Sequence, residues 1–336
     1  MKRKFLTMAM LVTMMSVVTA CGGGEEESGN TNNKKQEEFK GEEIPKGGKY
    51  VVKKSKKTLK AGSNMPETPA SGDRYSFGDY VYTMGTDGWS VKLAGEDFAT
   101  KTSFGEILET IAGEPITDLS NLFIGCVAMT ESPAIPSTVV VMNNTYEGCT
   151  SLVNPPVIPS TVTSMQYTFN KCKSLVKAPA IPSGVTTLSY TFSECESMTE
   201  ASELPAGLTS MQYTFNKCGK LVKPPVVPDG VKNMTHAFAD CVSLEETPTI
   251  PSKAIDISGI FMNCTKLTTP PTIPAGVKYM SDSFNGCIGF TGQMVIDANP
   301  TERANCFRLV NFKEQNLELT GASKNLDKLM KTGIYE

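Results

Sequence analysis

The chain has 336 residues, of which 40% are hydrophobic and 20% charged, and its formal net charge at pH 7 is −3. Because nucleic-acid binding depends on clustered Lys and Arg, this slightly acidic balance argues against nucleic acid as a partner. The chain has a single histidine, His236, and no CxxC pair, GxGxxG motif or phosphate loop. These absences argue against hydrolytic, metal-dependent and nucleotide-dependent enzymes, so we expect no catalytic residue, no metal site and no cofactor.

The amino end is typical of a bacterial secretion signal. Three basic residues at 2–4 precede an apolar run at 5–18, which is too short for a stable membrane span. The segment ends in Val18-Thr19-Ala20-Cys21, which resembles the lipobox of bacterial lipoproteins. This resemblance implies cleavage after residues 1–20 and a diacylglycerol on Cys21; the alternative is an ordinary signal peptide followed by a chance cysteine. We expect lipid anchoring to the cell membrane or outer membrane, with exposure outside the cytoplasm.

Residues 21–72 are expected to form a flexible polar tether. The segment begins with three glycines and continues with Glu, Ser, Asn, Lys and Gln, a composition that cannot build a core. Removal of residues 1–20 deletes three positive charges and no acidic residue, so the net charge falls from −3 to about −6. A lysine-rich stretch at 53–60 could contact anionic lipid or wall polymer, although a solvated tether is the simpler interpretation.

Residues 73–115 are predicted to form an N-terminal cap made of a hairpin and a helix. Two strand-like segments, 79–83 and 89–93, flank a four-residue turn sequence that contains two glycines. A helix is expected over 107–112, because a Ser-x-x-Glu capping box precedes it and Gly113 follows as a stop. The hairpin and the helix would close the exposed end of the core that follows.

The middle of the chain is a repeat of 23 residues. Eight cysteines recur at this interval without an insertion, a regularity that is the signature of a solenoid. An aromatic residue lies three positions before each cysteine, and a large apolar residue lies three positions after it. One unit has too few apolar residues for a core, so neighbouring units must stack and bury these columns. Cys306 lies off the period, so we expect the ladder to end before it. The periodic residues are Cys126, Cys149, Cys172, Cys195, Cys218, Cys241, Cys264 and Cys287.

Each unit is predicted to contain a short strand and a tight turn. A Val-Thr-x-Met segment, as at 162–165, is rich in β-branched residues and predicts a strand in a parallel ladder. The spacing of apolar residues around the cysteine indicates one helical or 3₁₀ turn. A Pro-x-apolar-Pro sequence, as at 156–159, would end each strand. Two units depart from this pattern, at 201–205 and 252–257, and are expected to have altered loops.

Two columns of charge test the stacking independently. One position before the cysteine, basic and acidic residues alternate from unit to unit, and five positions after it they alternate in the same phase. Equivalent positions on neighbouring rungs of a parallel ladder lie roughly 4.8 Å apart, so both columns place opposite charges side by side. We expect these pairs to help set the register; the alternative is coincidence on a charged surface. The columns are Lys171, Glu194, Lys217 and Asp240, and Lys177, Glu200, Lys223 and Glu246.

Residues 291–336 are predicted to form a C-terminal cap of strands and a helix. Segments 293–297 and 317–319 have the residue types of strands. A helix is expected over 323–331, with the serine at its first position as N-cap and Gly333 as stop.

In its 23-residue repeats the chain resembles the BspA-like leucine-rich-repeat surface proteins of bacteria. The shared signature is Phe-x-x-Cys-x-x-Leu followed by Ile-Pro-x-x-Val-x-x-Met, and it recurs in phase over 116–290. The chain departs from the commonest form of the family by having Pro-x-Ile-Pro before the strand. The resemblance implies a right-handed, β-rich leucine-rich-repeat solenoid with cell-surface display and a role in adhesion or host interaction. It implies no catalytic residues.

The cysteine column has three interpretations. Buried free thiols that pack as small apolar groups and bond backbone carbonyls are favoured, because the column is directed at the core. Disulfides between neighbouring units suit the distance and an oxidising compartment, but each sulfur would have to leave the core. A ladder of metal ions is the third interpretation.

The column five positions before the cysteine varies in residue type and is the candidate binding surface. It places three tyrosines and the histidine on consecutive units, with polar residues one position earlier. Tyrosine offers a large contact area with a polar tip, as in many binding surfaces. The alternative is a half-exposed aromatic ladder that binds nothing. The candidate binding residues are Tyr167, Tyr190, Tyr213, His236, Gln166 and Gln212.

We therefore interpret the chain as a lipid-anchored, non-enzymatic surface protein for adhesion or protein recognition. Its partner would be an unknown protein or glycan on a host or neighbouring cell. A carbohydrate-binding module that uses the tyrosines and a purely structural envelope protein are the two alternatives.

Overall fold

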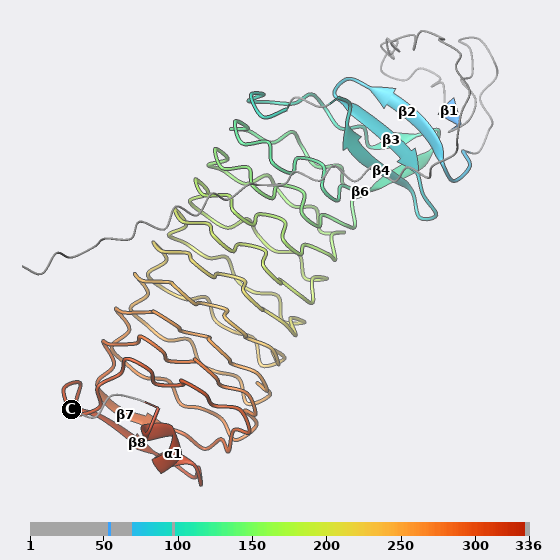
Figure 1. The fold of residues 1–336 in the computed structure, drawn as a ribbon. Helices are drawn as coiled ribbons and strands as arrows, with labels where there is room; N and C mark the ends of the chain where they lie inside the picture. The colour runs from blue at the N-terminus through green and yellow to red at the C-terminus, as the bar shows by residue number, and fades with distance from the viewer. Residues whose placement is uncertain (1–52, 55–68, 96–97, 333–336) are drawn as a thin grey trace, which may run out of the picture. The chain divides into compact units, whose positions relative to one another are not determined.

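The computed structural model describes residues 53–54, 69–95 and 98–332. The predicted signal peptide, Cys21, most of the tether and the predicted helix stop at Gly333 lie outside the described residues. All described residues belong to one compact unit, Gly41–Glu336. Figure 1 shows its plan, which is a sheet of short strands, a series of stacked rungs, and a pair of strands with one helix.

A six-stranded sheet precedes the repeats and contains the predicted hairpin. β3 and β4 pair antiparallel from Tyr80 and Leu93 to Met84 and Trp89, which confirms the hairpin. β2, which the sequence did not predict, pairs with the other edge of β3, while β4 pairs in parallel with β6. The side chains of Tyr80 and Trp89 are fully buried beneath the sheet. The strands, in the order β1-β2-β3-β4-β6-β5, are β1 (Lys53–Lys54), β2 (Asp73–Phe77), β3 (Tyr80–Met84), β4 (Trp89–Leu93), β6 (Glu114–Asp118) and β5 (Thr110–Ile111).

The predicted helix over 107–112 is wrong. Its two isoleucines are buried, as the helical spacing required, but residues 107–109 form no helix and the following residues form β5. Ala112 and Gly113 have φ of 53° and 82° and form the two-residue turn that joins β5 to β6. So short a helix is marginal on its own. The sheet competes for its backbone groups, since the Leu108 N–H donates to the hydroxyl of Tyr82 at 3.1 Å.

The 23-residue units stack as the rungs of a parallel ladder (Figure 1). Equivalent residues on neighbouring rungs pair as isolated parallel bridges, for example Thr187 with Ser210. Within the predicted strand segment the bridge involves one residue of each rung, so the strand lies in the predicted place but is shorter. Two further bridges, Lys177 with Glu200 and Ile273 with Ile296, lie outside this segment. Further along each rung, alternate N–H groups donate to the next rung, as Tyr190 does to the Gln212 carbonyl at 2.9 Å.

The predicted helical turn around each cysteine is a series of separate turns. N–H groups bond the carbonyl three residues back, as from Cys195 to Phe192 at 3.2 Å and from Met198 to Cys195 at 3.0 Å. The residue before the cysteine interrupts the run because its φ is positive, for example 60° at Glu194. A left-handed residue cannot continue a right-handed helix. The apolar spacing therefore predicted the turns correctly but not their separation.

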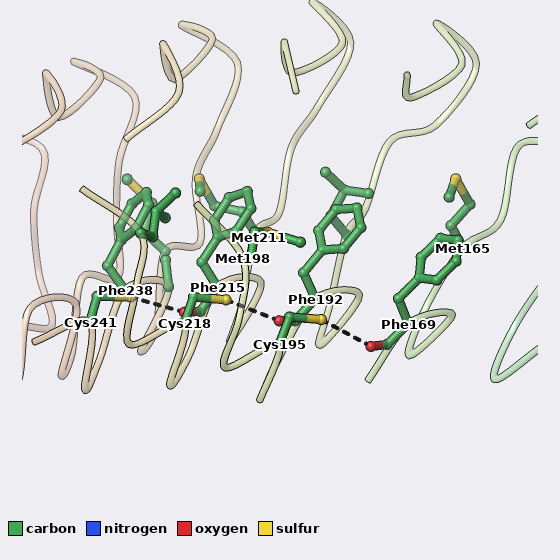
Figure 2. Packing of buried hydrophobic residues seen from close by; sticks show 14 of the residues in the cluster. Met165, Phe169, Phe192, Cys195, Met198, Met211, Phe215, Cys218, Phe238 and Cys241 are labelled. Carbon is green, nitrogen blue, oxygen red and sulfur yellow. Dashed lines mark hydrogen bonds between the residues drawn. The ribbon is translucent and has the colours of Figure 1, made fainter. Parts of the chain in front are cut away.

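Two buried columns hold the rungs together. Nine aromatic rings, from Phe123 to Phe307, stack from rung to rung with centroids 5.3–6.2 Å apart, and all are fully buried. We call these rings the buried ladder. Beside them, each thiol from Cys149 to Cys287 donates to the carbonyl of the aromatic residue on the preceding rung (Figure 2). The described cysteines are buried and free, in agreement with the buried-thiol interpretation.

The ladder extends one rung beyond the predicted end. Phe284 stacks on Phe307 at 5.3 Å, with the planes inclined by 22°. In this last rung Val310 takes the place of the cysteine and is fully buried. The prediction that the ladder ends before Cys306 is therefore wrong. A valine fills the space of a buried thiol, so the period of the fold continues where the period of the cysteines stops.

The C-terminal cap contains the elements that the sequence predicted, with a shorter helix. β7 (Gly292–Val295) and β8 (Leu317–Thr320) pair in parallel, and α1 (Leu326–Met330) follows them. The helix begins after Asn325, because the hydroxyl of Ser323 accepts the N–H of Asn325 at 3.2 Å and does not cap a helix.

The charge columns form ion pairs between neighbouring rungs. Their side chains are exposed for the most part, so the pairs add little stability. They join opposite charges in the predicted register, which a slip by one rung would change, although Lys171 and Asp240 of the first column form no ion pair among the described residues. The pairs are Lys177–Glu200 (2.8 Å), Lys223–Glu246 (3.4 Å) and Lys217–Glu194 (3.7 Å).

Candidate functional site

Nine residues, one on each rung, share an unusual backbone conformation at the position of the candidate binding column. Their φ angles lie between 51° and 62°, in the left-handed region. Asn, Asp and Gly tolerate this region, whereas a left-handed conformation costs other residues on the order of 1–2 kcal/mol. Five of the nine positions hold Asn, Asp or Gly, and the other four hold three tyrosines and the histidine. In chain order the residues are Asn121, Asn144, Tyr167, Tyr190, Tyr213, His236, Gly259, Asp282 and Asn305.

The ladder itself imposes this conformation. The Tyr190 N–H donates to the next rung, while the Tyr190 carbonyl accepts the N–H of Ser193 at 3.2 Å. The same two bonds recur at Tyr167 and Tyr213. The N–H and the carbonyl of each tyrosine are therefore both hydrogen-bonded, and the side chains project from fixed positions.

Tyr167, Tyr190, Tyr213 and His236 form a continuous stack of rings, which we call the ring stack. Consecutive centroids are 4.5–4.6 Å apart and the ring planes differ by 2–7°. The rings of Tyr190 and Tyr213 therefore have both faces covered by neighbours. The three tyrosines are only partly buried, so part of each side chain is accessible to solvent. Burial, and then the neighbouring phenols, raise the pKa of Tyr190, so its hydroxyl stays protonated at neutral pH.

Gly259 ends the ring stack. Its φ is 62°, and a Cβ there would lie 2.4–2.6 Å from three atoms of the His236 ring. The imidazole therefore lies against the backbone of the next rung, at a distance that only glycine permits. Gly259 occupies the same column on the rung that follows His236. In the sequence, this close contact was indicated only by the glycine that occupies the column directly after the four ring-bearing residues.

His236 is held as a neutral ring. Burial lowers its pKa below the ordinary value of 6.5, although the carboxylates of Asp282, Asp240 and Asp256 oppose this shift. Its Nδ1 atom is buried without a hydrogen-bond partner among the described residues. A charge on the ring would be poorly solvated there, so the stack favours the neutral form.

Gln166 and Gln212 lie one position before two of the tyrosines, on the same rungs, and are partly exposed. Their backbone groups take part in the hydrogen bonds between rungs. In the part of the chain that the structure describes, their side-chain amides have no hydrogen-bond partner. The structure thus brings the six candidate binding residues onto neighbouring rungs. The remaining predicted site residue, Cys21, lies outside the described residues.

Grouping and burial limit the chemistry that the described residues can perform. Among residues 53–54, 69–95 and 98–332, no three His, Cys, Asp or Glu side chains are grouped so that they could hold a metal ion. Burial raises the pKa of Cys126 to about 11 and of Cys218 to about 12, so these thiols are not nucleophiles at neutral pH. A shallow recess of about 390 Å³ lies beside Ala201, in the irregular fourth unit. Its charged residues, Glu200 and Lys223, are engaged in ion pairs with other rungs.

One observation bears on membrane association. Within the described residues, no helix combines the length and the apolar character that crossing a bilayer requires.

Comparisons with known proteins place the repeats in a family. Solved structures with similarity include a leucine-rich repeat protein from Bacteroides ovatus, which is 16% identical, covers 77% of this chain and 81% of its own, and has a TM-score of 0.48. A leucine rich cell surface protein from Faecalibacterium prausnitzii is also 16% identical, with coverage of 80% and 99% and a TM-score of 0.42. No curated protein matches the chain. Residues 119–245 and 212–322 match the family model for the BspA type leucine rich repeat region, in six copies. Since this match spans more than half of the chain, the protein belongs to the BspA-type leucine-rich-repeat family.

Proposed function

We propose that this protein is a lipid-anchored, non-enzymatic bacterial surface protein that recognises a protein on a host or neighbouring cell through its repeat surface. The family supports surface display, and the position of Cys21 directly after the signal supports lipid anchoring. The ring stack is the observation that carries the proposal. It presents rigid, partly exposed aromatic groups with polar tips, a composition suited to protein recognition.

The two alternatives make different demands on the ring stack. A sugar usually packs its C–H groups on the open, electron-rich face of an aromatic ring. The faces of Tyr190 and Tyr213 are covered by neighbouring rings, which argues against this mode of glycan binding. A purely structural protein would need the tyrosines for stability, so the free energy of unfolding of variants without these rings separates this role from recognition.

Lipid anchoring is tested by the variant Cys21→Ser. The serine hydroxyl cannot form the thioether to diacylglycerol, so the variant should leave the membrane fraction and collect in the soluble fraction. The nearby substitution Thr31→Ser should leave the membrane fraction unchanged. Membrane association of Cys21→Ser equal to that of the wild type would contradict lipid anchoring.

Recognition of a protein is tested by attachment of cells that carry the full-length chain to epithelial cells or to neighbouring bacteria. Pretreatment of the target cells with trypsin should abolish attachment, whereas periodate oxidation of their glycans should not. Tyr190→Asn should reduce attachment, and Tyr279→Asn, four rungs away, should not. Attachment that does not depend on the chain would overturn the proposal, and sensitivity to periodate alone would transfer it to the carbohydrate alternative.

A further inference from the structure

Three neighbouring rungs carry an exposed face without a charged side chain, which we call the uncharged face. On each rung it comprises two adjacent pairs of side chains separated by one buried residue, and all twelve carry a hydroxyl or an amide and are partly or fully exposed. Charged residues make up 20% of the whole chain, so this composition is a local departure. The face consists of Thr163, Ser164, Gln166, Tyr167, Thr186, Thr187, Ser189, Tyr190, Thr209, Ser210, Gln212 and Tyr213.

Charges resume at two borders of the uncharged face, whereas the preceding rung carries no charged side chain at the equivalent positions, 140–144. The following rung brings Lys232, and four positions after each tyrosine the rungs carry Lys171, Glu194 and Lys217. Lys217 and Glu194 are paired with each other at 3.7 Å. An uncharged surface with charged residues along two of its borders is consistent with a protein–protein interface, because the cores of such interfaces are depleted of Lys, Glu and Asp.

The tyrosines of the uncharged face are not required by its backbone. On five other rungs the same left-handed position is filled by Asn, Asp or Gly, which adopt it with little strain. The stacking of the rings offsets strain that those smaller residues would avoid. Strained residues that the fold could replace with relaxed ones are concentrated at functional sites. The tyrosines therefore point to a role outside folding.

The uncharged face is also ordered before any ligand arrives. The ladder bonds fix the backbone of each tyrosine, and the neighbouring rings fix its side chain. Binding then loses less side-chain entropy, which is the advantage that rigid tyrosines give to antibody binding sites.

We propose that the uncharged face is the centre of the binding surface and that its ligand is a charge-poor stretch of another protein with accessible peptide groups. This inference rests on the proposed function and names the chemistry of the partner. A charged side chain pressed against the face would lose water without gaining an opposite charge, so the face selects against charge. Hydroxyls and amides both donate and accept hydrogen bonds, which matches peptide N–H and C=O groups.

The size of the face predicts how it acts. Three rungs give a contact smaller than the roughly 800 Å² per partner of a stable complex. Single contacts should therefore be weak, with dissociation constants on the order of micromolar or above. Many copies on one membrane would convert such contacts into firm attachment.

The test uses the full-length protein, purified in mild detergent and immobilised, with a phage-displayed library of random 12-residue peptides as the probe. Peptides selected without bias should be poor in Asp, Glu, Lys and Arg, and salt between 50 and 500 mM should change their binding less than about threefold. Tyr190→Asn should weaken their binding at least tenfold, because asparagine keeps the backbone and removes the ring. Tyr279→Asn is the matched control and should change binding less than twofold. Circular dichroism should show that both variants are folded.

The remaining outcomes overturn the proposal. Selected peptides that are charged, lose binding in salt, or bind Tyr190→Asn as well as the wild type would show that the ligand chemistry or the location is wrong. Failure to select any peptide that depends on Tyr190 would have the same consequence. So would binding of neutral cello-, malto- or chito-oligosaccharides that Tyr190→Asn abolishes. The trypsin and periodate experiment on cells is independent of this one, so the proposed function can stand if the uncharged face does not.

Discussion

The buried ladder and the ring stack run through the same rungs but differ in burial and backbone. Phe169, Phe192 and Phe215 are fully buried and stack at 5.7 Å. Two residues earlier on each rung, the tyrosines stack at 4.5–4.6 Å, are partly exposed, and have a left-handed backbone. The buried ladder follows the hydrophobic demand of the fold, whereas the tyrosines occupy positions where the fold would accept asparagine. Two columns with the same 23-residue period can therefore serve different roles. Burial and backbone strain distinguish the buried ladder from the ring stack.

Alkaline pH should destabilise the protein through its buried cysteines, and we expect this effect to be the largest. The nine described cysteines are buried and free, and burial raises the pKa of Cys218 and Cys264 to about 12 from the ordinary 9.0. The native state keeps protons that the unfolded chain releases above pH 9. Stability is therefore complete below pH 9 and falls as the pH rises towards 12, by about 1.4 kcal/mol per pH unit for each thiol. Circular dichroism should show cooperative unfolding at roughly pH 10–11.

The pH dependence of the free energy of unfolding shows whether the buried thiols cause this alkaline transition. A double variant with Cys218→Ala and Cys264→Ala releases fewer protons on unfolding, so its free energy of unfolding should depend less steeply on pH. An unchanged pH dependence would show that the thiols are not the groups responsible.

Removal of one ring from the buried ladder should have the next largest effect. Phe192→Ala leaves a cavity in the core and should lower the free energy of unfolding by about 3–5 kcal/mol. Urea unfolding followed by circular dichroism measures this loss. Tyr190→Asn, two positions away, should change the same quantity by less than about 1 kcal/mol. Losses of similar size in the two variants would remove the distinction between the ladders.

Gly259→Ala should have a smaller effect that is specific to the ring stack. Alanine at a φ of 62° is strained, and its Cβ would clash with the His236 ring, so the expected loss is about 1–2 kcal/mol. The clash disappears when His236→Ala is already present, so the two substitutions should be non-additive by about 0.5–1 kcal/mol. Additive losses in urea unfolding would contradict the contact.

Acid titration of His236 should have the smallest effect. Its folded pKa lies below 6.5, so its contribution is present above pH 6.5 and is lost as the pH falls through the folded pKa. Since the ring is partly exposed, the contribution should be at most a few tenths of a kcal/mol. With one histidine in the chain, proton NMR gives both pKa values directly. A folded pKa at or above the value in urea would contradict the neutral ring, and His236→Asn should abolish the dependence.

The repeats could be predicted from the sequence because each structural position recurs as a column. The aromatic and cysteine columns identified the core, and the charge columns identified the pairs that join neighbouring rungs. The cysteine spacing alone predicted the end of the ladder one rung too early, because Val310 is buried at the position of the cysteine in the last rung.

The cap and the backbone of the binding column were harder to predict. The isoleucines near residue 110 suit one face of a helix, and they equally suit an extended chain lying over a sheet, where long-range bonds decide. The left-handed conformation of Tyr190 has no local signal, because tyrosine disfavours it. Only the asparagines and Gly259 elsewhere in the column carried that information. The candidate residues could be named from the sequence, whereas their strain and their covered faces required the structure.

The free energy of unfolding of the triple variant Tyr167→Asn, Tyr190→Asn and Tyr213→Asn tests most directly whether these tyrosines serve recognition rather than folding. Stacking contributes roughly 0.5–1.5 kcal/mol per pair, and asparagine relieves about 1–2 kcal/mol of strain per residue. The triple variant should therefore unfold within about 2 kcal/mol of the wild type while cell attachment is lost. A loss of about 5 kcal/mol or more, comparable to opening the buried ladder, would contradict the account and make the ring stack a structural element.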